Sequence, residues 1–159
     1  MPAVREKLGL SSVDGQKLSQ PRSNRPRPPT FIDTSPDYPT EQARRATFRT
    51  KQGKKLTAFQ WAVYDFTRKV PCGRVTTYKD VCTAIGRGSP RSVGAALRNN
   101  PFAPSVPCHR VIASNCYVGG FFGEWGASRC SAKIHMLTNE GVEFTTDGYL
   151  ANKGVVWRG

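Results

Sequence analysis

The sequence predicts a small α/β domain in which helices dominate, with a helix-turn-helix and a few short strands in a winged-helix-like arrangement. Three observations support this fold class: the composition changes near residue 56, three segments between residues 57 and 99 carry helix caps, and a short apolar run follows at residues 111–112. The chain of 159 residues is long enough for one ordinary domain. We therefore expect one domain over residues 56–159, preceded by a disordered basic tail over residues 1–55.

The predicted tail is rich in proline and in basic residues. Residues 1–55 hold seven of the twelve prolines, and twelve Lys or Arg against five acidic residues. Such a segment buries too little apolar surface to offset the entropy lost on ordering. A solubilising arm is the simpler interpretation. The alternatives are non-specific DNA affinity or nuclear import through Lys51, Lys54 and Lys55.

The net charge of +13 favours an anionic partner, most often nucleic acid. No stretch approaches ~18 consecutive apolar residues, which argues against a transmembrane span. The N-terminus lacks the apolar region of a secretory signal peptide. The five cysteines form an odd number and none lies in a C-x-x-C pair, so we expect a reducing compartment rather than a disulfide framework or a zinc ribbon.

Three helices are expected between residues 57 and 99. The first begins at a capping box of Thr57 and Gln60 and stops before Pro71. Its apolar stripe comprises Phe59, Ala62, Val63, Phe66 and Val70. The second helix begins near Thr77, after a possible short strand at Val75–Thr76, and ends at Gly86. The third has Ser89 as its N-cap and Pro90 as its first residue, and it runs to about Asn99.

The third helix has two different faces. Its apolar face consists of Val93, Ala96 and Leu97, and the opposite face consists of Arg91, Gly94, Ala95 and Arg98. Two arginines beside two small residues would let the helix approach another backbone closely and bind phosphates or enter a groove. A solvated basic face explains the same pattern, and from the residues alone both interpretations remain open.

Cys108 lies where a reactive group could be held in a fixed direction. Pro104 and Pro107 stiffen the chain before it, and an apolar run follows it. Since a free thiol has a pKa near ~8.5, it needs help to ionise, which His109 and the charge of Arg110 could supply. The simpler interpretation, a small buried hydrophobe, is taken for Cys72, Cys82, Cys116 and Cys130. A zinc site built from Cys108, His109, Cys116 and Cys130 would match no familiar ligand spacing.

The segment Pro107–Ile112 (PCHRVI) resembles the active-site motif of the O6-alkylguanine-DNA alkyltransferases, also called methylated-DNA–protein-cysteine methyltransferases. Four further segments resemble the same family in the same order: Phe59–Val63, Gly73–Tyr78, Arg91–Pro101 and Asn139–Gly141. The resemblance covers roughly residues 56–144.

The resemblance implies direct, irreversible transfer of an alkyl group from O6-alkylguanine in DNA to the protein, without a metal or cofactor. Cys108 would be the nucleophile and alkyl acceptor. His109 would be its base, acting through a bridging water, and Glu140 would orient the imidazole. Tyr78 would lie beside the flipped guanine and donate its hydroxyl hydrogen to the ring. Each molecule would act once.

The resemblance also assigns the DNA contacts. Arg91 would enter the minor groove and fill the gap left by the flipped nucleotide, and Asn100 would fix the turn that follows the recognition helix. The remaining DNA-contacting residues would be Gly94, Ala95, Arg98 and Arg110. The substrate pocket would include Val111, Gly120, Phe121 and Phe122, with the Cys108 and Val111 carbonyls accepting from the exocyclic amine of guanine. The implied partner is double-stranded DNA containing O6-alkylguanine, bound by a monomer in the nucleus of a eukaryote or otherwise in the cytoplasm.

The sequence departs from the family pattern in three places. The usual N-terminal domain is replaced by the predicted tail. Phe121 stands where the family has a pocket tyrosine, and Phe122 stands where a smaller residue is usual. Glu124–Arg129 looks inserted before a last helix at about Cys130–Asn139.

Two alternative functions therefore remain. One is a lesion sensor that binds O6-alkylguanine DNA without transfer and recruits another repair pathway. The other is a cysteine hydrolase that uses Cys108 and His109, which is disfavoured because neighbours in an extended segment point to opposite sides.

Overall fold

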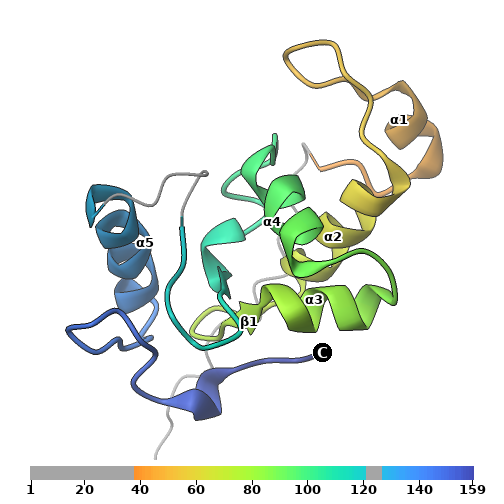
Figure 1. The fold of residues 1–159 in the computed structure, drawn as a ribbon. Coiled ribbons are helices and arrows are strands. Elements are labelled where there is room, and N and C mark those ends of the chain that lie inside the picture. Colours follow the sequence, from red (N-terminus) through yellow and green to blue (C-terminus); the bar gives the residue numbers. More distant parts are fainter. Residues whose placement is uncertain (1–37, 121–126) are drawn as a thin grey trace, which may run out of the picture.

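The computed structural model describes residues 38–120 and 127–159, and it shows a helix-dominated domain with two short strands (Figure 1). The elements in chain order are α1 (Gln42–Thr47), α2 (Ala58–Arg68), β1 (Thr76–Thr77), α3 (Tyr78–Ile85), α4 (Pro90–Arg98), the 3-10 turn η1 (Cys108–Arg110), β2 (Val111–Ile112), α5 (Ala127–Asn139) and the 3-10 turn η2 (Lys153–Val155). Within the described ranges, no helix combines the length and apolarity needed to cross a membrane.

The three predicted helices are confirmed. Their ends were predictable because they are set by capping residues close in sequence. The Thr57 side chain accepts a hydrogen bond from the Gln60 amide, which completes the expected capping box. Ser89 caps α4 in the same way, with Pro90 in the first turn. Gly86 ends α3 in the left-handed conformation, with a φ of 73°.

The turn between α3 and α4 depends on Gly88. Its φ is +86°, and a Cβ atom placed there would lie 2.5 Å from Cε2 of Phe59 on α2. Glycine therefore allows the turn to pass close to α2. As a result α3 and α4 form a helix-turn-helix packed beside α2 (Figure 1).

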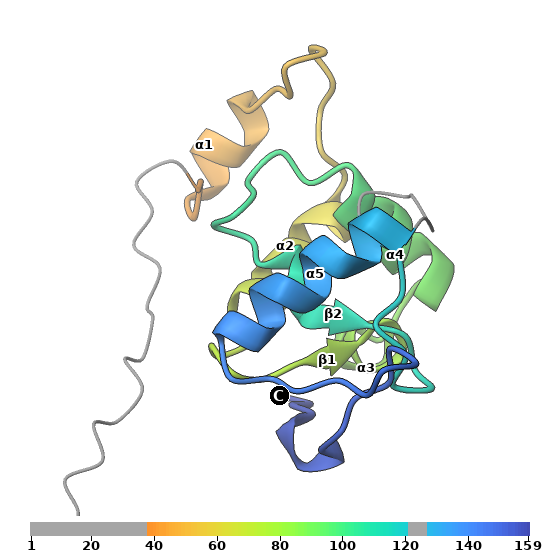
Figure 2. The same ribbon diagram turned by 90° about the vertical axis from the view of Figure 1, so that its left-hand side faces the viewer.

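The two strands are parallel, with Thr76 opposite Val111 and Thr77 opposite Ile112 (Figure 2). β1 begins one residue later than expected, because Val75 forms a separate bridge with Val156. Alternate residues of a strand face opposite sides. Val111 accordingly packs into the core beneath α2, α3 and α4, whereas Ile112 packs into a second core. β2 is thus held from both sides.

Residues 38–55 differ from the expected disordered tail. Tyr38 is only 3% exposed, and its ring centroid lies 5.9 Å from that of Trp61 and 4.9 Å from that of Phe102. Phe48 contacts the same two rings, and Arg45 forms a 2.6 Å ion pair with Asp65 of α2. We call residues 38–56 the N-terminal arm. Residues 1–37, the remainder of the predicted tail, lie outside the described residues.

The buried residues of α2 extend beyond the predicted stripe. Val63 of the predicted stripe is buried, but Phe59 and Phe66 are only half-buried. Trp61 and Tyr64 are buried as well, since Tyr38, Phe48 and Phe102 cover Trp61 while the Tyr64 hydroxyl donates to the Ala96 carbonyl. The arm was missed because Tyr38 and Phe48 are isolated aromatic residues whose partners are distant in sequence.

If the arm belongs to the folded domain, Tyr38→Ala will lower the free energy of unfolding by roughly 3–5 kcal/mol, the cost of removing a buried aromatic side chain. Tyr149→Ala is the matched control, because Tyr149 is the large hydrophobic side chain that is 45% exposed; we expect it to cost about 1 kcal/mol or less. Urea denaturation measures both. Equal costs would place residues 38–48 outside the cooperative unit.

Candidate functional site

Cys108 lies in a tight turn at the end of the proline-rich loop that follows α4. Its side chain is buried, its amide donates to the Val106 carbonyl at 2.8 Å, and its carbonyl accepts from the Val111 amide. The expected extended conformation at Cys108 and His109 is not observed. The two residues form a 3-10 turn that the Arg110 amide closes by donating to Pro107, so strand alternation no longer separates their side chains.

Asn100 makes two hydrogen bonds within this loop. Its Nδ2 donates to the Val106 carbonyl at 3.0 Å, and its Oδ1 accepts from the Phe102 amide at 2.9 Å. It also hydrogen-bonds to the Cys108 side chain. Asn100 therefore acts within the loop, at the base of the recognition helix.

The pKa of the Cys108 thiol is raised by burial, which outweighs several opposing effects. The hydrogen bond from Asn100, the positive charge of Lys133 and nearby backbone amides all favour the thiolate. Because burial prevails, the resting thiol is protonated at neutral pH. Any nucleophilic role then requires a group that takes up its proton.

The Glu140 carboxylate joins three segments of the chain. Its Oε1 accepts from His109 Nε2 at 2.7 Å and from Arg110 at 2.9 Å. Its Oε2 accepts from Arg110 Nε at 2.9 Å and from the Gly73 amide at 3.4 Å. Arg110 also donates to the Val70 carbonyl at 2.9 Å. The end of α5 and the loop after α2 are thereby fastened to the cysteine turn.

Arg110, a predicted DNA contact, bonds within the protein in this structure. Its guanidinium is mostly buried and donates to Glu140 and Val70. The bidentate geometry fits a carboxylate closely. No local pattern indicates this pairing, because Glu140 lies thirty residues further along the chain. Arg110 thus positions Glu140, which in turn orients His109.

The pKa of Glu140 is lowered to about 2. Burial, the largest single effect, acts to raise it, but the hydrogen bonds and positive charges of His109 and Arg110 together outweigh burial. Glu140 therefore stays ionised at neutral pH, and its carboxylate anion holds the imidazole of His109.

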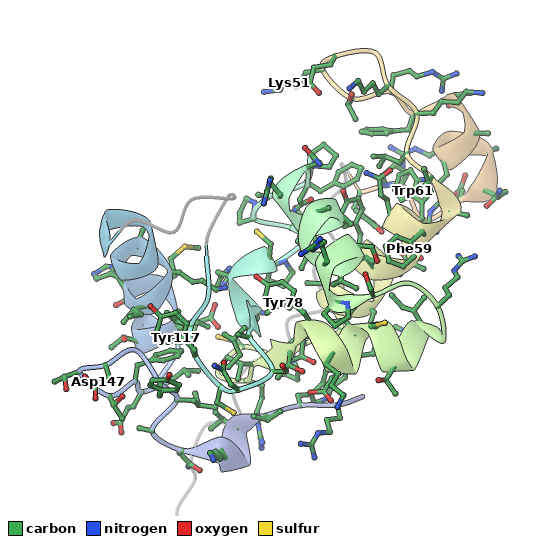
Figure 3. All side chains as sticks on the ribbon, viewed as in Figure 1. Lys51, Phe59, Trp61, Tyr78, Tyr117 and Asp147 are labelled. Atoms are coloured by element: carbon green, nitrogen blue, oxygen red, sulfur yellow. The ribbon has the colours of Figure 1, made fainter. Side chains whose placement is uncertain are left out.

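Tyr78 lies at the start of α3, next to α4 (Figure 3). A Cβ atom added to Gly94 would lie 3.9 Å from its ring, an ordinary van der Waals contact, so Gly94 of α4 lies directly beside the tyrosine. Burial and the charge of Cys108 raise the pKa of Tyr78 to about 12. Its hydroxyl consequently keeps its hydrogen and can donate it.

Lys133 of α5 is a functional candidate that sequence reasoning missed. It is fully buried, and its ammonium donates to the Val111 carbonyl at 2.6 Å and to the Gly120 carbonyl at 3.4 Å. It also lies 5.8 Å from the centre of the Tyr78 ring. The spacing could have indicated it, because Lys133 lies seven residues before Glu140, which directly follows the last residue of α5, so a helix continued to Glu140 would place both on one side.

The two faces of α4 are as predicted. Val93, Ala96 and Leu97 are buried, whereas Arg91, Ala95 and Arg98 are exposed and Gly94 is half-buried.

The predicted pocket is only partly described. Val111 is buried and Gly120 half-buried, but Phe121 and Phe122 lie outside the described residues. Among the described residues, no three His, Cys, Asp or Glu side chains are grouped so that they could hold a metal ion.

The Glu140 network predicts a pH effect on stability. Since folding lowers its pKa from 4.5 to about 2, Glu140 stabilises the fold above pH ~4.5, and this contribution is lost as the pH falls toward 2. Glu140→Gln should cost on the order of 3 kcal/mol at pH 7 and progressively less below pH ~4.5. Urea denaturation between pH 7 and 3 measures this difference, with the exposed Glu143→Gln as control. A cost that does not change with pH would contradict the network.

The chain is similar to curated proteins that carry the same name. A methylated-DNA–protein-cysteine methyltransferase of Metallosphaera sedula is 50% identical over 64 residues, which are 40% of this chain and 40% of that protein. The protein of the same name from Methanothermobacter thermautotrophicus is 45% identical over 86 residues, 54% of this chain and 46% of that protein. The chain thus matches less than half the length of these curated relatives.

A solved structure, S. pombe Atl1 in complex with damaged DNA containing O6-carboxymethylguanine, is also similar. It is 27% identical, with a TM-score of 0.57, and the match covers 67% of this chain and all of that one.

The family model described as 6-O-methylguanine DNA methyltransferase, DNA binding domain, matches residues 58–142. This range runs from α2 past Glu140, so it contains the helix-turn-helix, the cysteine turn and the Glu140 carboxylate that bonds to His109. Since the match spans more than half of the chain, the chain belongs to the 6-O-methylguanine DNA methyltransferase family by its DNA-binding domain.

Proposed function

We propose that this protein repairs DNA by transferring an alkyl group, such as methyl, from O6-alkylguanine to its own Cys108. The observation that carries the proposal is the cysteine turn. A buried thiol lies in one 3-10 turn with a histidine that the ionised Glu140 holds. The family membership and the names of the relatives support the same reaction.

DNA binding would begin at the exposed basic face of α4. Arg91 and Arg98 carry its charge, and Ala95 between them is small enough to let the helix approach a DNA backbone. The alkylated base must leave the duplex to reach the buried thiol, at a cost of a few kcal/mol. Insertion of Arg91 into the space left behind offsets part of that cost.

The transfer itself is a displacement at the alkyl carbon. The proton of the Cys108 thiol passes to His109 through a water molecule, and the sulfur attacks the alkyl carbon. The bond between that carbon and O6 breaks, its electron pair remains with the guanine, and the Tyr78 hydroxyl supplies a proton to the ring. A stable thioether results, so each molecule reacts once.

Two buried residues position this machinery. Lys133 lowers the cost of forming the thiolate through its charge, and it also holds the Val111 carbonyl, an expected guanine acceptor. Arg110 keeps Glu140 ionised and fixed, so that the imidazole of His109 keeps one orientation.

A lesion sensor that does not transfer the alkyl group is the second candidate. The match to the whole of Atl1 bound to damaged DNA favours it. Cys108 weighs against it, because the thiol that would accept the alkyl group is present and buried. We further infer a monomer that acts on duplex DNA, and the archaeal sources of the relatives favour a cytoplasmic over a nuclear location.

Cys108→Ser should abolish alkyl transfer and leave DNA binding within about twofold, because an alcohol is far less acidic than a thiol. The measurement is intact and peptide mass after incubation with duplex DNA that carries O6-methylguanine. The wild type should gain one methyl, mapped to Cys108 and saturating at one per chain. Cys82→Ser is the control and should be alkylated like the wild type. Lesion-specific binding without any adduct would establish the sensor instead.

Arg91→Ala should weaken capture of the lesion at least tenfold more than it weakens binding to undamaged duplex, because the arginine is proposed to act only once the base has flipped. Fluorescence of a base analogue placed opposite the lesion reports flipping, and anisotropy reports binding. Arg87→Ala, in the turn before α4, is the control. An equal loss in both assays would contradict insertion and would indicate that Arg91 only contacts phosphates.

A further inference from the structure

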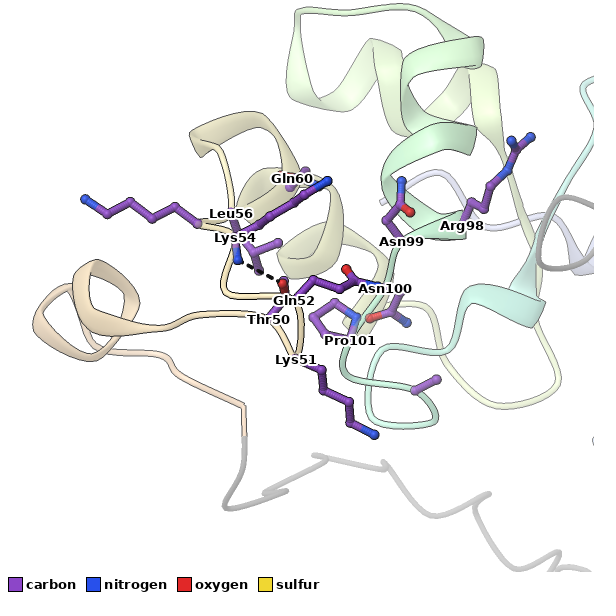
Figure 4. A pocket seen from close by; sticks show the side chains of 12 residues that line it. Thr50, Lys51, Gln52, Lys54, Leu56, Gln60, Arg98, Asn99, Asn100 and Pro101 are labelled. Carbon is purple, nitrogen blue, oxygen red and sulfur yellow. Dashed lines mark hydrogen bonds between the residues drawn. The ribbon is translucent and has the colours of Figure 1, made fainter.

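A basic cleft lies between the N-terminal arm and the C-terminal end of α4 (Figure 4). Its volume is about 580 Å³, and it is lined on one side by the turn at Thr50–Lys54 and on the other by Arg98 and Asn99. Three lysines of the arm, Lys51, Lys54 and Lys55, contribute to it, and none of the described residues that line it is acidic. Such a cleft fits an anionic ligand.

The turn that carries the lysines has a defined conformation. The Gly53 amide donates to the Thr50 carbonyl at 2.8 Å, and the Thr50 amide donates to the Lys54 carbonyl at 2.9 Å. The Lys54 amide also donates to Thr50 Oγ1 at 3.2 Å. Gly53 has a φ of +76°, which a turn of this kind requires. The lysine side chains therefore extend from a fixed backbone.

The turn is also fastened to the domain. Phe48, two residues before Thr50, contacts the rings of Trp61 and Phe102, and the ion pair of Arg45 with Asp65 anchors α1. Leu56, directly after the lysines, packs against the core. Because both ends of the turn are held, its position relative to α4 is set by the fold.

The cleft continues the basic face of α4. Arg98 lines the cleft and also belongs to the exposed face that carries Arg91. Seven residues of helix separate the two arginines, a rise of about 10 Å on the same face. One basic surface thus runs from Arg91 through Arg98 to Lys51 and Lys54. Several positive charges on one continuous surface suit the repeated phosphates of a nucleic acid strand.

We propose that this cleft binds the phosphate backbone of the same DNA duplex that α4 engages, beyond the damaged base pair. The proposal rests on the DNA-repair function proposed above. The lysines contact phosphates and no bases, so they add affinity without regard to sequence or damage. The arm thereby extends the DNA contact past the end of the recognition helix.

The test compares two variants of the full chain with the same change of charge. Lys51→Gln/Lys54→Gln removes two charges from the cleft, whereas Lys69→Gln/Lys153→Gln removes two exposed charges elsewhere. Anisotropy with a 20-bp duplex at several salt concentrations gives affinity and its salt dependence. We expect the cleft variant to bind about tenfold or more weakly at 50 mM salt, with a slope of log K against log[salt] smaller by about 2. The control should change both only slightly.

Two further readouts separate the cleft from the rest of the site. The loss should be equal for damaged and undamaged duplex, and the rate of methyl transfer at saturating DNA should not change. Equal losses in the two double variants, or no loss in the cleft variant, would overturn the proposal while the repair function stood. If the wild type neither binds the duplex nor accepts methyl, both proposals fail.

Discussion

The Glu140 carboxylate is the contact on which the candidate site depends. It accepts from His109, from two nitrogens of Arg110 and from the Gly73 amide, so one side chain fastens the cysteine turn, α5 and the loop after α2. A mostly buried carboxylate costs free energy unless such partners compensate it. The arrangement is therefore interdependent, since loss of any partner leaves the others buried without full compensation.

Opposing effects act on the pKa of the Cys108 thiol. Burial disfavours the thiolate, and the buried ammonium of Lys133 together with the Asn100 amide favours it. A thiol in this balance stays protonated at rest and can still ionise when a proton acceptor is aligned. The same ammonium donates to the Val111 carbonyl, so one side chain acts on the thiol and also holds the strand that follows it.

Sequence reasoning succeeded where the determining interactions are local. The caps at Thr57, Gly86 and Ser89 involve residues within a few positions, and so their helix ends are as predicted. The failures involve partners far apart in the chain. Tyr38 and Phe48 lie in the expected disordered tail, but they pack against Trp61 and Phe102, which are distant in sequence. The pairing of Arg110 with Glu140, thirty residues away, likewise has no local signature. The family resemblance supplied the roles of His109 and Glu140, which spacing alone would not have joined.

The aromatic cluster of the arm includes a member of the active-site loop. Phe102, six residues before Cys108, contacts Tyr38, Phe48, Trp61 and Tyr64. A change in the size of any of these rings must be absorbed by the others, because such a core has little free space. Selection on the loop that carries Cys108 therefore acts also on a segment more than fifty residues earlier, and the two segments should change together among descendants of this gene.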